Sequence, residues 1–301
     1  MNAVPLVTII AVCYNQEKWV EETLNSIKKQ TYPNIQLVVA DDGSKDNSKQ
    51  IIRDWLTQNM PDATFINHPV NLGLTKNLNS ALPLIKGEYF QAFGCDDIMV
   101  STKIEDQVAL LEKNESFDIV YNDMFVIDGK GKLDPESYYE KNKYKKPLSG
   151  NIYSDLVDRF IISAPSVLLR TTVLHELKGY NEDLIYEDHD FFLRAARNHN
   201  YLYTPDKTVL YRMSGESLST QPHFFQFYKN TFLIYYQNFD GRKDYKPIFT
   251  KKLLFYAKNL YSEKFKYISS FCLKAFLKTG NKEFLKYTIA GLRYYFTSKK
   301  I

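Results

Sequence analysis

Apolar residues in the first hundred positions follow two different periods. Short continuous apolar runs, typical of strands that are covered on both faces, lie at 5–14, 35–40, 63–67 and 88–93. In the segments between these runs, apolar residues recur at helical spacing, at 17–30, around 51–55 and at 75–86. This alternation of strand and helix predicts a parallel, doubly wound sheet with right-handed crossovers.

The pattern is less regular after residue 100. Further helices are expected at 103–113 and 188–198. Further strands are expected at 117–121, 165–170 and 207–212. The Lys- and Tyr-rich stretch 128–150 is typical of a mobile loop. The helical period then returns and predicts four helices, at about 223–238, 247–261, 264–278 and 282–296. We therefore expect an α/β protein with a Rossmann-like, doubly wound mixed sheet and a C-terminal helical extension.

The net charge of +4 conceals a strong asymmetry along the chain. Residues 221–301 contain 16 Lys and Arg against 4 Asp and Glu, whereas residues 1–220 contain 23 against 31. The same tail holds 22 of the 43 Phe and Tyr residues. Such a change in composition marks a boundary, so we predict a catalytic domain at 1–220 and a basic, aromatic-rich helical region at 221–301.

Two interpretations of the tail stay open. Aromatic residues at helical spacing usually form a core, which favours a small bundle with solvated lysines. Polybasic amphipathic segments also bind anionic membrane surfaces, which would place the protein at the inner face of the cell membrane. Nucleic acid is not expected as a partner, because residues 1–220 are acidic and no nucleic-acid-binding motif is visible.

Cysteine usage and hydropathy both favour a cytoplasmic protein. Cys13, Cys95 and Cys272 are widely spaced and follow no disulfide or zinc pattern. No apolar stretch reaches the roughly 18–20 residues that a membrane-spanning helix needs. The N-terminal residues lack the basic start and the cleavage site of a signal peptide, and they are expected to form the first strand.

Acidic pairs follow three apolar segments, at Asp41-Asp42, Asp96-Asp97 and Glu187-Asp188. One pair alone would fit a turn or a helix cap. Ligands of doubly wound sheets bind beyond the carboxyl ends of the strands, and several acidic pairs at that edge would repel one another without a cation. A diphosphate ligand with Mg²⁺ or Mn²⁺ supplies such a cation, and Asp96 and Asp97 are the best candidates to hold it.

These pairs lie within longer strings that are similar to a known family. The strings are VTIIAVCYNQEKWVEETLNSIKKQTYPNIQLVVADDGSKDNS at 7–48, NLGLTKNLNSALPLIKGEYFQAFGCDDIM at 71–99, GYNEDLIYEDHDFFLRAARN at 179–198 and YRMSGESLS at 211–219. Over about residues 5–219 they resemble the family 2 inverting glycosyltransferases of bacterial type, which share the A-type nucleotide-sugar transferase fold. The resemblance implies transfer of a sugar from a nucleotide-diphosphate donor to an acceptor hydroxyl, with Mn²⁺ or Mg²⁺ as the cofactor.

The resemblance also implies which residues contact the donor. They are Val12, Tyr14, Asn15, Asp42, Gly73, Asn79, Asp96 and Arg212. Among them, Asp42 would accept a hydrogen bond from the ring N–H of the base, as such enzymes do with uracil, and this favours UDP. Asp96 and Asp97 occupy the region of the Asp-x-Asp motif, which contacts ribose and metal, and either of them can be the main metal ligand.

Asp188 matches the catalytic base of the resembled family. In a single displacement the acceptor oxygen attacks the anomeric carbon opposite the leaving group, so the configuration inverts, and a carboxylate on that face takes the proton. The metal neutralises the charge on the departing nucleoside diphosphate. Glu187 would orient the acceptor or fix Asp188 in place.

Two positions depart from the family pattern. Gly94 stands where the first acid of the motif is usual, which leaves the metal geometry open. Many relatives carry a His after the Tyr-Arg pair of the last strand, but here Met213 follows Arg212. The Arg212 guanidinium either pairs with the diphosphate or caps local carbonyl groups.

Two rival functions compete with transfer. A sugar-nucleotide pyrophosphorylase would show a Gly-rich loop with Arg and Lys after the first strand, and this chain has YNQEK at 14–18 instead. A non-catalytic homologue, kept as a subunit or membrane platform, is the alternative that Gly94 leaves open. The resemblance implies a hexosyl- or N-acetylhexosaminyl-transferase acting on a glycan or lipid-linked glycan in bacterial surface polysaccharide or glycolipid synthesis.

Overall fold

The chain forms two compact units. The computed structural model describes residues 4–144, 147–214 and 224–298. The first unit comprises Met1–Tyr153 and Phe160–Gln221, and the second comprises Ser154–Arg159 and Pro222–Ile301. The predicted boundary at residues 220 and 221 lies outside the described residues. The short segment Ser154–Arg159 joins the C-terminal helices, which no pattern in the sequence indicated.

The described part of the first unit is built on an eight-stranded mixed sheet with the strand order β3-β2-β1-β4-β7-β6-β8-β5. Strands β3, β2, β1 and β4 are parallel, β7 runs antiparallel to both β4 and β6, β8 is parallel to β6, and β5 is antiparallel to β8. The strands are β1 (Val7–Cys13), β2 (Ile35–Asp41), β3 (Thr64–Asn67), β4 (Tyr89–Gly94), β5 (Ile98–Met99), β6 (Ile119–Asp128), β7 (Leu168–Arg170) and β8 (Tyr201–Met213).

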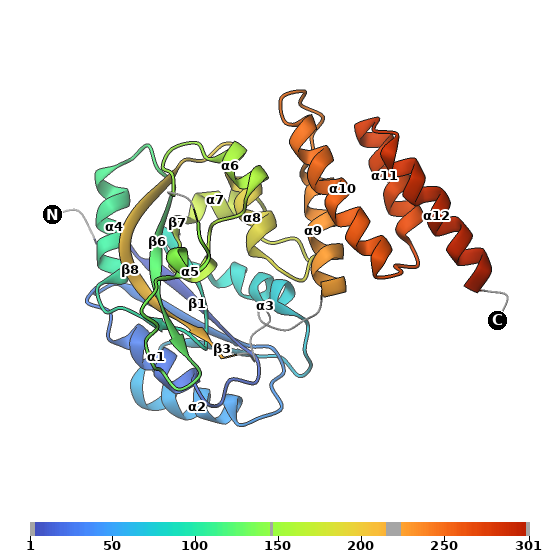
Figure 1. The fold of residues 1–301 in the computed structure, drawn as a ribbon. Helices are drawn as coiled ribbons and strands as arrows, with labels where there is room; N and C mark the ends of the chain where they lie inside the picture. The colour runs from blue at the N-terminus through green and yellow to red at the C-terminus, as the bar shows by residue number, and fades with distance from the viewer. Residues whose placement is uncertain (1–3, 145–146, 215–223, 299–301) are drawn as a thin grey trace. The chain divides into compact units, whose positions relative to one another are not determined.

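Amphipathic helices cover the sheet and bury the apolar residues that recur at helical spacing in the sequence. Helix α1 (Val20–Lys28) buries Val20, Leu24 and Ile27, and it lies beside α2 (Ser48–Asn59), as Figure 1 shows. Helix α3 (Leu74–Ala81) continues into the 3-10 helix η1 (Leu82–Leu84), and α4 (Lys103–Lys113) follows β5. The prediction of an α/β protein with a doubly wound mixed sheet is confirmed, with the same alternation of strands and helices.

The segment predicted to be a loop at 128–150 has structure of its own. It contains the one-turn helix α5 (Tyr138–Lys141), and the buried Tyr139 anchors it. The loop expected at 128–150 thus contains a helical turn that the pattern did not indicate, because tyrosines supply its buried contacts in place of aliphatic residues. Other short elements that the pattern did not indicate are α6 (Tyr153–Asp158), the 3-10 helix η2 (Ala164–Ser166) and α7 (Thr171–Glu176), which precede α8 (Asp188–Ala195).

The second unit contains the four predicted C-terminal helices, which lie side by side in chain order (Figure 1). They are α9 (Phe224–Asn238), α10 (Lys246–Ser262), α11 (Ile268–Thr279) and α12 (Glu283–Ser298). Aromatic side chains such as Phe232, Tyr235 and Phe249 are buried within the unit, as the bundle interpretation expected. A Cβ atom at Gly291 would lie only 2.6 Å from Ile268 Cγ2, so the glycine allows α11 and α12 to pack closely.

Candidate functional site

The polar ends of three strands meet at one edge of the sheet. The backbone N–H of Asp42, just after β2, donates to the carbonyl of Cys13 at the end of β1, at 2.8 Å. On the other side of β1, the N–H of Cys95 donates to the carbonyl of Val12 at 3.0 Å. The acidic pairs after β2 and β4 therefore flank the end of β1, as the strand order requires.

Tyr14 and Asn15 form the turn after β1. Tyr14 is exposed, and Asn15 has a positive φ of 54°, a conformation that Asn tolerates better than most residues. The Asn15 backbone N–H donates to Ser44 Oγ at 2.9 Å, and its side-chain oxygen accepts from the Lys45 N–H at 2.8 Å. Asn15 therefore holds the β1 turn against the Asp-Asp-Gly-Ser turn that follows β2.

Asp42 fixes the loop that leads into α3. Its side chain is 3% exposed, and its two oxygens accept from the backbone N–H groups of Leu72 at 2.7 Å and Gly73 at 2.9 Å. A Cβ atom at Gly43 would lie 2.4 Å from the carbonyl carbon of Val70, so only glycine allows this close approach. Each carboxylate oxygen has two acceptor positions, which leaves capacity for the N–H of a ligand.

Asp96 and Asp97 form an acidic pair at the end of β4, in which Asp97 is buried and Asp96 is half-buried. Asp97 is 3% exposed, and burial raises its pKa well above the usual range, with a further increase from the charge of Asp96. Burial also raises the pKa of Asp96, although Arg212 and a hydrogen bond from Gln16 oppose the increase. A Cβ atom at Gly94 would lie 2.7 Å from Asp96 Oδ1. The Asp96 carboxylate thus occupies the space that a side chain at position 94 would need.

Arg212 holds this acidic turn in place from β8. Its backbone N–H donates to Asp97 Oδ1 at 2.8 Å, and its Nε donates to the Asp96 carbonyl at 2.7 Å. Its Nη1 reaches the Asp128 carbonyl at 3.3 Å, and its Nη2 pairs with Glu22 at 2.6 Å. The residue is 2% exposed, so the structure favours the carbonyl-capping interpretation, and direct pairing with a diphosphate would require these contacts to be exchanged.

Glu187 and Asp188 stand at the N-terminus of α8, and both are half-buried. Asp188 Oδ1 accepts from the His189 N–H at 2.6 Å. Burial raises the pKa of Asp188 to about 6. Burial and the charge of Asp188 raise the pKa of Glu187 to about 8. Of the two carboxyls, Asp188 is therefore the one that ionises first.

Helix α3 is hydrogen-bonded to the segment 180–184, which precedes Asp188 in the chain. The Asn79 amide nitrogen donates to the carbonyl of Tyr180 at 2.8 Å, and Asn79 Oδ1 accepts from the Tyr180 N–H at 3.0 Å. Thr75 Oγ1 donates to the carbonyl of Leu184 at 3.1 Å. Asn79 thus links two segments of the protein. Its predicted place beside the donor stays a prediction.

A second set of contacts connects Asp188 with the acidic turn. The rings of Tyr138, on α5, and Tyr211, on β8, lie 5.2 Å apart. Tyr211 precedes Arg212, whose backbone holds Asp97. On the other side, the Tyr139 hydroxyl of α5 donates to the Ile161 carbonyl, and the adjacent Phe160 stacks its ring on that of His189, the residue after Asp188, at 4.5 Å. Two independent chains of contacts, through α3 and through α5, therefore bring the predicted acids to one region of the first unit.

The residues at this edge fit a divalent cation that arrives with a diphosphate. Within the described ranges, no group of three or more His, Cys, Asp or Glu side chains is arranged to hold a metal ion. Asp96 and Asp97 offer two carboxylates whose burial and mutual repulsion a cation would relieve. Mg²⁺ is typically held by one or two carboxylates together with substrate phosphates. The sequence reasoning missed Gln16, which the YNQ string contains and which contacts Asp96.

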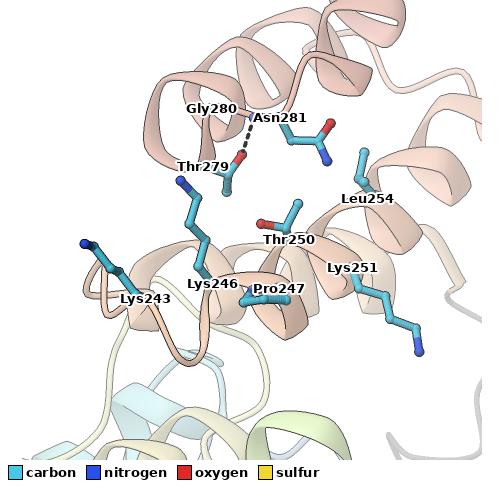
Figure 2. Close-up of a pocket in the computed structure, with 9 residues that line it drawn as sticks. All are labelled: Lys243, Lys246, Pro247, Thr250, Lys251, Leu254, Thr279, Gly280 and Asn281. Carbon is cyan, nitrogen blue, oxygen red and sulfur yellow. Dashed lines mark hydrogen bonds between the residues drawn. The ribbon is translucent and has the colours of Figure 1, made fainter.

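The second unit has a separate open groove of about 580 Å³ (Figure 2). Its lining residues are Lys243, Lys246, Pro247, Thr250, Lys251, Leu254, Thr279, Gly280 and Asn281. A Cβ atom at Gly280 would lie 3.9 Å from Lys246 Nζ, and Gly280 ends α11 in the left-handed conformation. Lys246 is therefore placed to complement the carbonyl end of that helix, which gives it a structural role. No helix in the described part of the chain is long and apolar enough to cross a membrane.

Comparison with known proteins identifies a family for the chain. The sequence pattern of the family described as Glycosyl transferase family 2 matches residues 8–177. A glycosyltransferase from Haemophilus influenzae is 28% identical over 227 residues, which cover 73% of this chain and 69% of that protein. A glycosyltransferase from Rickettsia felis is 34% identical over 199 residues, and the match covers 64% of this chain but only 32% of the relative.

Solved structures share the fold at lower sequence identity. Staphylococcus aureus TarS 1–349 in complex with UDP has a TM-score of 0.67 and 22% identity, and the match covers 96% of this chain and 89% of that one. The mannosyltransferase PcManGT from Pyrobaculum calidifontis, in complex with GDP-Man and Mn²⁺, has a TM-score of 0.61 and 17% identity, with 97% and 86% covered. Because the family pattern spans more than half of the chain, from β1 to beyond β7, the protein belongs to glycosyl transferase family 2.

Proposed function

We propose that this glycosyltransferase moves a hexose or N-acetylhexosamine from a UDP-linked donor to an acceptor hydroxyl, with inversion and with Mn²⁺ or Mg²⁺. The observation that carries the proposal is the pair of contact chains that link the acidic strand ends to Asp188. TarS has been crystallised with UDP and with UDP-GlcNAc, and PcManGT with GDP-Man and Mn²⁺. The buried carboxylate of Asp42, which would accept the ring N–H of uracil, favours UDP in this chain.

In this proposal the end of β1 and the loop after β2 form the donor side. Val12, Tyr14 and Asn15 contact the nucleotide, and Gly73 begins the helix that packs beside it. Asp42 serves two purposes, because it holds the backbone of that loop and keeps acceptor capacity for the base. The fixed loop lowers the entropic cost of binding, since the donor meets a preformed surface.

Asp96 and Asp97 would hold the cation between them and the diphosphate. When bound, the cation offsets the negative charge that builds on the departing nucleoside diphosphate. Arg212 then acts as a positioning residue, because its backbone N–H holds the Asp97 carboxylate and its Nε holds the Asp96 carbonyl, while the rest of the guanidinium bonds to Asp128 and Glu22. Gln16 orients the Asp96 carboxylate.

Asp188 is proposed as the general base. As the acceptor oxygen bonds to the anomeric carbon, the bond from that carbon to the diphosphate oxygen breaks, and the acceptor proton passes to Asp188. Glu187 keeps its proton at neutral pH because its pKa is raised to about 8, so it can donate a hydrogen bond to an acceptor oxygen. The two carboxyls would thus differ in role because they differ in charge state.

Donor titration separates a transferase from a non-catalytic homologue. UDP, UDP-GlcNAc and GDP-Man are titrated into the protein by calorimetry with and without Mn²⁺, and nucleotide release is followed over time. We expect metal-dependent binding of UDP and its sugar, with turnover. Metal-dependent binding without any release from a panel of UDP-sugars would support the non-catalytic alternative, for which Gly94 is the specific observation. Failure of all nucleotides to bind would overturn both.

The role of Asp188 is tested by Asp188→Asn, which keeps the shape of the side chain. We expect transfer to fall at least about 100-fold, because a general base is lost, while UDP affinity stays within about twofold. Asp183→Asn is the matched control, since Asp183 is an exposed carboxylate in the same loop. Full transfer by Asp188→Asn would remove the residue from this role.

For the second unit we propose attachment to an anionic membrane surface, where a glycan or lipid-linked glycan of a bacterial surface polysaccharide or glycolipid would serve as acceptor. The supporting observation is that Leu273 and Leu277 on α11 and Ile289 and Leu292 on α12 are exposed. They belong to a region that carries 16 basic residues. Exposed apolar groups combined with basic side chains are typical of segments that bind at a lipid interface.

A further inference from the structure

The one-turn helix α5 is stabilised well beyond what so short a helix achieves alone. Ser137 and Glu140 form a reciprocal capping box, in which Ser137 Oγ accepts from the Glu140 N–H at 3.3 Å and Glu140 Oε2 accepts from the Ser137 N–H at 2.7 Å. Lys141 pairs with Asp134 at 2.5 Å. Isolated helices of this length do not persist in water, so the side chains of α5 are held in place by these contacts.

Tyr139 fixes the orientation of α5. It is 5% exposed, its backbone N–H donates to Asp123 Oδ1 at 3.1 Å, and its hydroxyl donates to the carbonyl of Ile161 at 2.9 Å. Successive side chains on a helix point about 100° apart. With Tyr139 buried, the preceding Tyr138 points in a different direction and stays half-buried.

The ring of Tyr138 is part of a small aromatic surface. It meets the ring of Tyr211 from β8 edge-to-face at 5.2 Å and the ring of Tyr144 at 6.1 Å. Tyr211, like Tyr138, is half-buried, so each ring keeps some exposed area. Segments far apart in the sequence thus place their tyrosine rings together, which we call the tyrosine platform (Tyr138, Tyr144 and Tyr211).

The tyrosine platform lies beside Asp188. The Tyr139 hydroxyl ties α5 to the Ile161 carbonyl, and the ring of the adjacent Phe160 stacks on the ring of His189, directly after Asp188, at 4.5 Å. In agreement, the charge of Asp188 contributes to raising the pKa of Tyr138. The Tyr138 phenol therefore stays protonated at neutral pH. Burial raises the pKa of Asp188 to about 6, so the carboxyl is ionised at neutral pH. An anionic group would be repelled here, whereas a neutral polar ring would not.

We propose that the tyrosine platform binds the sugar ring of a neutral acceptor and holds the attacking hydroxyl toward Asp188. This inference rests on the proposed function, since it takes Asp188 as the base. Sugar rings combine an apolar C–H face with polar hydroxyl edges. The exposed parts of the tyrosine rings can pack against the C–H face, and the phenol hydroxyls can form hydrogen bonds with the sugar hydroxyls. The platform thus indicates that the acceptor group at the reaction centre is a neutral glycoside and not a phosphate-bearing group.

Binding of simple glycosides tests the inference without knowledge of the natural acceptor. Protein with UDP and Mg²⁺ is titrated with methyl β-glucoside, methyl β-galactoside and methyl N-acetyl-β-glucosaminide, and binding is followed by saturation-transfer NMR. Glucose 6-phosphate serves as the anionic comparator. We expect at least one neutral glycoside to bind and glucose 6-phosphate to bind more weakly.

Variants assign that binding to the platform. Tyr138→Ala should weaken glycoside binding about fivefold or more, whereas Tyr138→Phe, which loses the hydroxyl but keeps the ring, should weaken it less. Tyr211→Leu provides a second variant on a different element. Tyr267→Ala, which removes an exposed tyrosine of the second unit, is the matched control and should have no effect. UDP affinity and the thermal midpoint are measured in every variant.

The outcomes separate this inference from the proposed function. Equal glycoside binding by the wild type, Tyr138→Ala and Tyr211→Leu overturns the platform, and so does a wild type that binds UDP but no neutral glycoside or that prefers glucose 6-phosphate. Loss of glycoside binding with unchanged UDP affinity supports it. Failure of the wild type to bind UDP with metal would instead overturn the proposed function, and the inference with it.

Discussion

Burial gives the two carboxyls at the start of α8 different charge states. The pKa of Asp188 rises from 3.8 to about 6, and that of Glu187 rises from 4.5 to about 8. At neutral pH Asp188 is therefore ionised while Glu187 keeps its proton. The different environments of the two carboxyls thus make Asp188 a proton acceptor and Glu187 a proton donor, as is common for pairs of catalytic carboxyls.

This difference predicts a pH dependence of rate. A general base works only when it is deprotonated, so kcat/KM should fall as the pH drops through about 6. Folding stability should change in the opposite direction. Because the folded protein binds this proton more tightly than the unfolded chain, the contribution of Asp188 to the free energy of unfolding is present below pH about 4 and lost as the pH rises to about 6. Rate profiles and urea denaturation across this range check both. A flat rate profile would contradict the assignment.

Gly94 is predicted to be required for the position of the Asp96 carboxylate. In Gly94→Ala the new Cβ would lie 2.7 Å from Asp96 Oδ1, so the carboxylate must move. We expect Mn²⁺-dependent UDP affinity to fall about tenfold, because the displaced carboxylate loses its place beside Asp97. Gly129→Ala is the control, since its Cβ would make ordinary contacts at 3.6 Å. Unchanged metal-dependent affinity by calorimetry would argue against Asp96 as a ligand.

At the scale of elements, the apolar pattern identified the helices and strands that are long enough to repeat it. The apolar runs located seven strands, and helical spacing located α4 and the four C-terminal helices to within a few residues. Strand β5 and helices α5, α6 and α7 are each too short to repeat their pattern, and they were missed. Strand β8 was predicted only over 207–212, because Thr204, Pro205 and Asp206 interrupt its apolar pattern.

The candidate site was predictable only in part for a related reason. The acidic residues stand at strand ends, where sequence order indicates their position. Gln16, Tyr138 and Asn79 act through contacts between segments far apart in the chain, as the bond from Asn79 to the Tyr180 carbonyl shows. For Arg212 the sequence left two sets of partners open, and only the structure shows that its side-chain donors face carbonyls and Glu22. No local pattern encodes such partners.

Arg212 connects four elements or loops through one guanidinium, and this predicts a stability effect. Arg212→Lys can keep one of these side-chain contacts but not all three. We expect the free energy of unfolding to fall by about 2–4 kcal/mol, since buried hydrogen bonds from a charged donor are lost. Metal-dependent UDP affinity should weaken in parallel. Arg53→Lys, at an exposed position on α2, is the control. Urea denaturation with no change between Arg212→Lys and the wild type would contradict this role.

At the scale of the whole molecule, charge and exposed apolar groups predict membrane binding by the second unit. Vesicles with anionic phosphatidylglycerol should retain the protein in a flotation assay, and high salt should release most of it. Leu273→Ser with Leu277→Ser should weaken retention, because Leu277 is 74% exposed and available to a lipid interface. Val70→Ser, an exposed apolar position of the first unit, is the control. Equal retention by neutral and anionic vesicles would contradict the electrostatic contribution to membrane binding.

The segment Ser154–Arg159 means that the chain visits the C-terminal unit twice. Leu156 and Val157 are fully buried, and Lys252 on α10 holds Asp158 through its carbonyl and its carboxylate. A protein cut after residue 220 would keep these six residues but lose what they pack against. Tails exchanged between relatives by simple fusion would face the same mismatch. Evolution can therefore replace the helical tail only by altering an internal stretch of the transferase sequence at the same time.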